Sequence, residues 1–491
     1  MKKIYLLISL IFFCYAQTLN AQPITLDPTF GQNGLAVFSS GLITHFEFDK
    51  YDNIIAAGSC EMWLNGWYDF PVLLKTDPNG NLDQTFGTDG MVILSDDFTE
   101  DWEIYGLKIT ADNKILLIIS SFPYISWKLN DGTWMIQFNE DGSLDHSYGN
   151  NGKVFLNPIL SIDLTNDDYF ITVSGDAESE FLLKQNYKGE IDTTFGNNGK
   201  VYMTDHKTFL IYPECVKILN DNSIIVAGCD HFTQAPLGHY INLAFFKLTP
   251  NGQFDTNFTG NGVVIIESGD VFGKSFYNVI GDTNGSLVFI GSKHADNGNN
   301  NKFISRFTSN GTVDSSFGEN GFLYYTEIHT DAYEKSLLQN GDKYLIGEIR
   351  TIYSFNNNGT VDSSFNNSGR FWLGDIDFFH AMKLRNNKVT VGGMKFNGYD
   401  YPMVMARINL LPDHSIQPHG FTDHRLIIFP NPAKDYLNFN AEQQFEIMDI
   451  QGRVLLKNKQ ATQSVDVSFL KAGIYFIRFE GSNRVMKFIK Q

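Results

Sequence analysis

The chain has 491 residues, of which 43% are hydrophobic, 14% aromatic and 19% charged, and this composition excludes an intrinsically disordered protein. Its net charge of −18 at pH 7 argues against a nucleic-acid-binding protein, because such proteins contact phosphates through Lys and Arg. The 42 Phe and 43 Gly beside 14 Pro predict many short strands joined by glycine turns.

The N-terminus has the pattern of a Sec signal peptide over residues 1–21. Lys2 and Lys3 precede an apolar run at residues 4–15, and Ala16 and Ala21 are small residues that suit two alternative cleavage sites. The run is too short for a membrane span, and no later segment approaches 18 apolar residues. We therefore expect a secreted protein without a transmembrane segment.

A nine-residue pattern recurs seven times between residues 26 and 369, with the order apolar, Asp, two residues, aromatic, three residues, Gly. The motif aspartates are Asp27, Asp83, Asp145, Asp192, Asp255, Asp314 and Asp362. The motif aromatics are Phe30, Phe86, Tyr148, Phe195, Phe258, Phe317 and Phe365. The spacing of 47 to 63 residues suits one four-stranded antiparallel sheet per repeat.

The residue types predict what each motif does. The Asp side chain can accept backbone N–H groups two or three residues on, and the closing Gly can adopt a positive φ. The aromatic ring is expected to be buried between neighbouring sheets. In six copies a further Gly stands three residues before the Asp, within a turn.

The motif, together with strands such as IIVAG at residues 224–228, resembles the delta-60 repeat family of secreted bacterial proteins. This resemblance implies a β-propeller over residues 26–410. The first motif has no strand before it and the last strand, at residues 403–410, has no motif after it, so we expect the two ends to pair. The predicted fold is an all-β, seven-bladed propeller, with a six- or eight-bladed ring or an open stack as alternatives.

Calcium is the cofactor that the sequence suggests. Asp77, Asn79, Asn81 and Asp83 place oxygen-bearing side chains at alternate positions around Gly80. The chain lacks the distal Glu of an EF-hand there, so a simple Asn-Gly turn is the favoured alternative.

The connections within the repeats differ in length, and the longest are rich in aromatic residues. In the fourth repeat a long loop is expected at residues 229–242. Loops of the first two repeats are expected to hold Trp63, Trp67, Tyr68, Trp127 and Trp134. These rings either pack on their own sheet or form a platform for sugar rings or a partner peptide.

The common catalytic motifs of hydrolases, zinc proteases and dinucleotide enzymes are missing from the sequence. Paired carboxylates in a propeller channel would suit a glycosidase, but an acidic chain brings carboxylates together by chance. Cys215 and Cys229 flank one predicted hairpin, and free, partly buried thiols are favoured over a disulfide.

The last part of the chain differs in charge and pattern. Residues 421–491 carry a net charge of +3, whereas the first 420 residues carry −21. Residues 411–425 have no period and are predicted to be a linker. Alternating apolar residues over 426–491 predict a small antiparallel β-sandwich.

This module resembles the type A sorting domain of the type IX secretion system. The positions that match most clearly are Pro430, Asn431, Pro432, Gly452, Gly473, Tyr475, Lys487 and Lys490. The resemblance implies a Gram-negative bacterium, Sec export into the periplasm, and passage across the outer membrane by the secretion machinery. The sequence thus predicts a secreted or surface-exposed, non-enzymatic binding or adhesion protein with a glycan or protein ligand. The alternative is an extracellular polysaccharide-degrading enzyme.

Overall fold

The structure is a computed structural model. It describes residues 24–63, 67–95, 102–121, 132–156, 159–164, 169–175, 180–202, 211–234, 238–266, 274–294, 300–326, 336–410, 428–429, 433–450, 453–479 and 485–491. These residues form β-strands and one short 3-10 helix, η2 (Phe365–Asn367), and none of their helices has the length and apolarity to cross a membrane. The predicted signal peptide and linker lie outside the described residues. The chain divides into two compact units, Met1–Pro412 and Asp413–Gln491.

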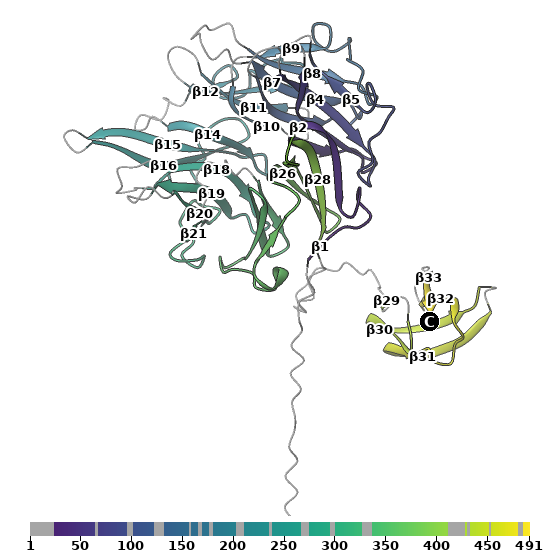
Figure 1. Cartoon of the computed structure of the whole chain (residues 1–491). Coiled ribbons are helices and arrows are strands. Elements are labelled where there is room, and N and C mark those ends of the chain that lie inside the picture. Colours follow the sequence, from purple (N-terminus) through teal and green to yellow (C-terminus); the bar gives the residue numbers. More distant parts are fainter. Residues whose placement is uncertain are drawn as a thin grey trace, which may run out of the picture. The chain divides into compact units, whose positions relative to one another are not determined.

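The first unit contains five separate four-stranded antiparallel sheets, each built from strands that follow one another in sequence (Figure 1). The first three are β6 (Trp102–Ile109), β7 (Ile115–Ser121), β8 (Thr133–Phe138) and β9 (Lys153–Leu156); β10 (Ile159–Leu164), β11 (Tyr169–Gly175), β12 (Glu180–Asn186) and β13 (Lys200–Tyr202); and β14 (Ile211–Ile218), β15 (Ile224–Gln234), β16 (Gly238–Leu248) and β17 (Val263–Ile266). The other two are β18 (Lys274–Gly281), β19 (Leu287–His294), β20 (Asn300–Phe307) and β21 (Phe322–Thr326); and β22 (Ser336–Asn340), β23 (Lys343–Glu348), β24 (Thr351–Asn356) and β25 (Arg370–Trp372).

An eight-stranded sheet joins the two ends of this unit. Its strands are β1 (Thr25–Leu26), β2 (Leu35–Phe48), β3 (Ile54–Trp63), β4 (Trp67–Thr76), β5 (Met91–Ile93), β26 (Phe378–Arg385), β27 (Lys388–Met394) and β28 (Pro402–Asn409). The first part of β2 pairs with β28, and from Gly41 onward β2 pairs with β3. In Figure 1 the purple N-terminal strand accordingly lies beside the green β28. Strand β2 therefore serves as the fourth strand of one four-stranded group and the first strand of the next.

Gly41 marks the point where β2 changes partners. Its φ is 144°, and a Cβ atom added there would lie 1.9 Å from the carbonyl oxygen of Ser59. A side chain at this position would collide with the backbone of β3. The glycine thus allows β2 to pass closely from one ladder to the next.

The sheets pack face to face through their apolar side chains. Ile115, Leu117 and Ile119 of β7 share one buried cluster with Ile55 and Leu73 of the preceding sheet. In addition, the first strands contact one another in cyclic order: β2 with β6, then β10, β14, β18, β22 and β26, which contacts β2 again. Every four-stranded group therefore has two neighbours.

The predicted long loop of the fourth repeat is a β-ladder instead. Strands β15 and β16 pair without interruption from Ile224 with Leu248 to Gln234 with Gly238, and Figure 1 shows this hairpin extending outward. The prediction of a loop at 229–242 was wrong because the two strands continue to pair in register beyond Gly228, through a segment whose residues are mostly polar. The first repeat behaves in the same way, since β3 and β4 pair as far as Trp63 with Trp67.

The second unit contains a five-stranded antiparallel sheet. Its strands are β29 (Ile428–Phe429), β30 (Tyr436–Met448), β31 (Val454–Asp466), β32 (Gly473–Phe479) and β33 (Val485–Lys490). Strand β30 is the hub, because it pairs with β29, β31 and β32. A separate core that includes Leu437, Ile447 and Phe488 holds the sheet together.

Candidate functional site

The seven repeated motifs have the geometry that the sequence predicted. In every copy the Asp side chain accepts the backbone N–H two residues on, at 3.0 or 3.1 Å. The closing glycines have φ between 76° and 97°. All seven aromatics are buried, which confirms that prediction. A Cβ atom on Gly80 would lie 2.8 Å from the Phe30 ring, so the motif aromatic of one four-stranded group packs beneath the turn of the next.

A cation accompanies each motif Asp, a feature that was not predicted from the sequence. In four repeats it stands eight residues before the Asp: Lys75, Lys184, Lys247 and Arg306 lie 2.8 to 3.7 Å from their carboxylates. The constant spacing of eight residues was the signal that could have revealed it. The cation neutralises a carboxylate that packing has partly removed from water.

Two repeats lack a cation at that position and supply one from another strand. Gln137 and Ser354 stand eight residues before Asp145 and Asp362. Here Lys114, immediately before β7, lies 3.1 Å from Asp145, and Lys343, at the start of β23, lies 2.9 Å from Asp362. The charge is thus kept while its position in the sheet changes.

The closing sheet supplies two cations to the first motif. Asp27 is almost fully buried and accepts Arg407 Nε and Lys388 Nζ, both at 2.7 Å. The Arg407 guanidinium lies over the Phe30 ring, with its Cζ atom 4.6 Å from the ring centroid. Arg407 also donates to the carbonyl of Pro78, which follows β4 in the next four-stranded group of the same eight-stranded sheet. A single arginine therefore connects the two ends of the repeat region.

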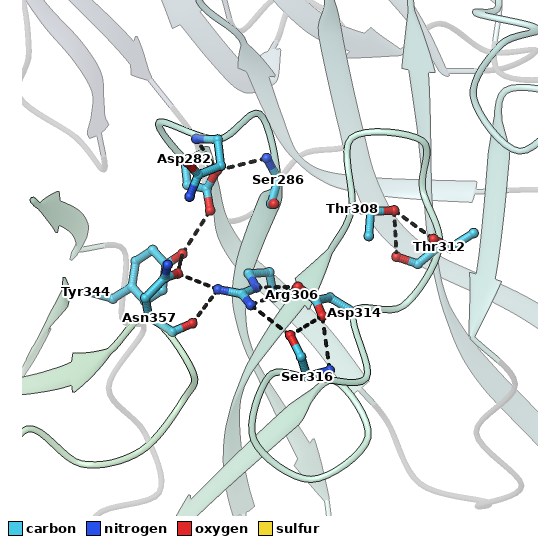
Figure 2. A network of polar contacts seen from close by, with 10 residues as sticks. Asp282, Ser286, Arg306, Thr308, Thr312, Asp314, Ser316, Tyr344 and Asn357 are labelled. Carbon is cyan, nitrogen blue, oxygen red and sulfur yellow. Dashed lines mark hydrogen bonds and ion pairs between the residues drawn. The ribbon is translucent and has the colours of Figure 1, made fainter. Parts of the chain in front are cut away.

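Figure 2 shows the equivalent network around Arg306. Arg306 lies 2.8 Å from Asp314, covers Phe317 at 5.0 Å and donates to the carbonyl of Asn357 in the next sheet. Tyr344 extends the network by donating to Asp282 at 2.9 Å. Burial raises the pKa of Tyr344 to about 12, so the phenol remains a neutral donor.

The third motif reaches the next sheet with a different group. Tyr148 replaces Phe, and its hydroxyl donates to the carbonyl of Tyr187. This carbonyl stands two residues before Gly189, as Pro78 does before Gly80, so the phenol takes the place of the arginine.

Six of the motif carboxyls have a lowered pKa, which favours their charged form. In Asp83, Asp145 and Asp192 the hydroxyl two residues on makes the largest contribution to a lowered pKa. In Asp27, Asp314 and Asp362 burial is the largest influence and acts to raise the pKa, but the hydroxyls and cations outweigh it, so that the pKa is lowered. These residues serve the junctions between sheets.

The predicted calcium ligands form a hydrogen-bonded turn. Asp77 Oδ1 accepts the backbone N–H groups of Asn79 and Asn81 at 2.8 and 2.9 Å, and Asn81 Nδ2 donates to Asp77 Oδ2. Asp83 is bound by Thr85 and Lys75. These oxygens face donors of the protein itself, and within the described ranges no three His, Cys, Asp or Glu side chains are placed to hold a metal ion. These four residues therefore have a structural role in the turn.

The predicted aromatic platform is only partly brought together. In the backbone register of the β3–β4 hairpin, Trp63 pairs with Trp67 and Met62 pairs with Tyr68. Trp127 lies outside the described residues. Trp134 lies in β8 rather than in a loop, half-buried, with its ring centroid 4.9 Å from that of Phe155. Its predicted loop position was wrong, because the β-prone segment 133–138 continues the sheet.

The cysteines of the hairpin are out of register. Ala227 is opposite Cys215, and Tyr212 is opposite Cys229. Cys60 and Cys215 are buried, free thiols, and burial raises the pKa of both.

A group of exposed rings lies on the loop between β27 and β28. Tyr399 is 100% exposed, and Phe396 and Tyr401 are 48% and 42% exposed. Phe396 and Tyr401 contact each other, with their ring centroids 4.9 Å apart. Phe396 was not predictable as a surface residue, because an isolated Phe in a strand-rich chain is usually a core residue.

The sorting residues have mixed positions. Tyr475 stacks on Phe488 with centroids 5.7 Å apart, and its hydroxyl donates to the carbonyl of Lys471. Gly473 pairs with Lys490, which is buried, whereas Lys487 is exposed. Pro430, Asn431, Pro432 and Gly452 lie outside the described residues.

Comparison with known families agrees with these features. Residues 427–491 match the secretion system C-terminal sorting domain, and residues 283–317 match a β-propeller domain of unknown function. The sorting domain indicates export by the type IX machinery to the medium or the cell surface.

Three known proteins resemble parts of this chain. Beta-agarase D of Zobellia galactanivorans is 35% identical over 65 residues, so the chain spans 14% of the length of this curated relative, and the match covers 13% of the chain itself. A protein of unknown function from Dyadobacter fermentans is 12% identical, with a TM-score of 0.40, over 78% of this chain and 100% of that one. An α-L-arabinanase of Penicillium chrysogenum is 11% identical, with a TM-score of 0.38, over 77% of this chain and 98% of that one. The chain is a propeller-like protein that carries a C-terminal sorting domain of the type IX secretion system.

Proposed function

We propose that this protein is a secreted or surface-displayed binding protein, in which seven blades form a closed ring and the C-terminal module is a β-sandwich used for export. The cyclic contacts of the first strands and the pairing of β2 with β28 support a seven-bladed ring. The domain limits that suit this proposal are a signal peptide at 1–21, repeats at 26–410, a linker at 411–425 and a sorting domain at 426–491.

The first strands, which would line the channel of such a ring, favour binding over catalysis. Asp163 lies 3.0 Å from Lys217 and accepts the backbone N–H of Ile218 at 2.7 Å. Glu47 lies 2.6 Å from Lys383. A carboxylate occupied in this way is poorly placed to act as a general acid or nucleophile.

The exposed rings of the β27–β28 loop carry the proposal. Flat amphipathic side chains bind sugar rings or peptides at a low cost in conformational entropy, and exposing them without a partner is unfavourable. The register also places Trp63 and Trp67 at the same end of the neighbouring β3–β4 hairpin. We expect the ligand, a glycan or a peptide, to contact this end of the ring.

A glycan and peptide array tests the proposal directly. We expect the full mature chain to bind a restricted set of ligands, and to release no products from polysaccharides of bacteria, algae or plants. Reducing-sugar release from any of them would replace the binding function with the hydrolase alternative.

Export is tested separately, by deleting residues 427–491 in a host with a type IX system. We expect the truncated protein to accumulate in the periplasm, because the recognition element is gone while the first unit keeps its own core. Normal appearance of the truncated protein in the medium would overturn the assignment of the tail.

A further inference from the structure

The β27–β28 loop surface, which we define as Phe396, Tyr399, Asp400 and Tyr401 together with Glu61 of β3, combines exposed rings with carboxylates. Asp400 lies between two of the rings in sequence, and Tyr401 N donates to its Oδ1 at 2.8 Å. Glu61 is joined to Asp400 through Ser40, whose Oγ lies 2.9 Å from Glu61 Oε2 and also bonds Asp400 Oδ1.

The rings are held in place by the loop backbone. Asn397 Oδ1 accepts the N–H groups of Tyr399 and Asp400, both at 3.0 Å. The N–H of Phe396 donates to Asp377 at 2.6 Å, and Gly41 N donates to the carbonyl of Tyr401 at 2.8 Å. A loop fixed in this way presents its side chains at little further entropic cost on binding.

The carboxylates of Glu61 and Asp400 can accept more hydrogen bonds than the described residues donate to them. The Ser40 hydroxyl has one hydrogen, yet two carboxylates lie on it. Asp69 is directly opposite Glu61, and burial together with the charge of Glu61 raises the pKa of Asp69. Among the described residues, no Lys, Arg or His forms an ion pair with Glu61, Asp69 or Asp400. A cationic donor would satisfy these groups.

The chain itself shows how a cation fits a carboxylate beside an aromatic ring. At two junctions a guanidinium lies close over a ring, at 4.6 and 5.0 Å, and binds a carboxylate: Arg407 with Phe30 and Asp27, and Arg306 with Phe317 and Asp314. At a third junction the ammonium of Lys247 lies farther from the ring of Phe258, at 6.0 Å, and 3.6 Å from Asp255. Planar guanidinium groups combine stacking with several directed N–H donors, which an ammonium cannot do.

We infer that the β27–β28 loop surface docks an arginine side chain of a partner polypeptide, stacked on Tyr399 or on the Phe396–Tyr401 pair and hydrogen-bonded to Asp400 and Glu61. This inference rests on the proposed binding function and names its ligand class. The acidic first part of the chain, at −21, complements such a partner.

The test uses the full mature chain, with fluorescent hexa-arginine, hexa-lysine and Ser-Gly peptides as probes. We expect hexa-arginine to bind more tightly than hexa-lysine, the neutral peptide not to bind, and added salt to weaken binding. Asp400→Asn and Tyr399→Ala should each weaken hexa-arginine binding about tenfold. Asp342→Asn and Tyr51→Ala are matched controls on exposed residues elsewhere, and they should retain parental affinity.

Each other outcome counts against the inference. Equal losses in the Asp342→Asn control would mean that peptide binding reflects net charge alone. Binding of a neutral glycan that ignores salt and is lost in Tyr399→Ala would assign the surface to sugars, leaving the binding function intact. Self-association that Tyr399→Ala abolishes in sedimentation would assign it to a second copy. If no array ligand and no peptide binds at all, the binding function fails as well.

Discussion

The sheet junctions and the β27–β28 loop surface place the same chemical groups in opposite settings. At the junction of Asp27, the ring of Phe30, the carboxylate and Arg407 are packed together between sheets. On the loop, the rings are exposed and the carboxylates of Asp400 and Glu61 are half-buried, and no arginine among the described residues covers them. At the junction, the arginine completes the set of ring, carboxylate and cation. On the loop the ring and the carboxylate are present without a cation, which leaves them able to bind a cation from another molecule.

The largest effect is expected from removing a junction ring. Phe195→Ala should lower the free energy of unfolding by about 3 to 5 kcal/mol, because Phe195 is fully buried beneath the turn at Gly252. A clear drop in Tm, measured in parallel scans, is the observable, since a chain of this size often unfolds irreversibly. Phe396→Ala, on the loop, is the matched control and should change Tm little. Similar losses in the two variants would erase the distinction between junction and loop.

A smaller effect is expected from removing a junction cation. Arg306→Met should cost about 1.5 to 3 kcal/mol, because Asp314 loses its charged donor. The chain offers a rescue, since Ser286 precedes β19 at the position that Lys388 occupies in β27. Adding Ser286→Lys should restore part of the lost Tm. Failure of this rescue would show that the strand on which the cation stands matters as much as its charge.

Acid should weaken the junctions. The pKa of six motif Asp carboxyls is lowered from 3.8 in the folded chain, so the unfolded chain binds more protons at low pH. Their contribution is complete above pH 4 to 5 and is lost as pH falls through the folded pKa values. Thermal scans from pH 7 to pH 3 should show a falling Tm, with a shallower slope in Asp27→Asn. A parental slope in that variant would exclude Asp27 as a source of the acid sensitivity.

The smallest effect concerns the junction that uses a phenol. Tyr148→Phe should cost about 0.5 to 1.5 kcal/mol through loss of the hydrogen bond to Tyr187. Tyr353→Phe is a suitable control, because the buried Tyr353 hydroxyl has no hydrogen-bond partner among the described residues. If the two variants have the same Tm, the Tyr148 hydroxyl does not replace the arginine.

Local features of the fold were predictable from the sequence, and features that depend on register were not. The motif fixed the burial of Phe195 and the positive φ of Gly199, because each follows from residue type and position within a short turn. The cation of Asp145 could not be read as easily, since Lys114 reaches it from another strand. The extent of the β15–β16 ladder also depended on pairing across the sheet rather than on local propensity.

The type of residue at the candidate site, aromatic, was predictable from the sequence, but the positions of these residues were not. Sequence patterns placed aromatic residues in the longer connections and left open whether they pack on their own sheet, but Trp134 proved to be a strand residue. The fully exposed Tyr399 lies on another connection, between β27 and β28. The link between Glu61 and Asp400 joins residues from opposite ends of the repeat region through Ser40. Such a contact arises only when β2 pairs with β28, and it cannot be predicted from the local sequence.

Because β2 pairs with both β3 and β28, its two sets of hydrogen bonds can form only at different times during folding. Leu35 must wait for Ala406 to be synthesised and exported before the two residues can pair. At about 5 to 20 residues per second, the delay is on the order of tens of seconds. During that time the edge of β2 that later meets β28 is unoccupied, and such an edge can pair with another chain. We therefore expect closure to be the last folding step of this unit, and to be slow because Leu35 and Ala406 are far apart in the sequence.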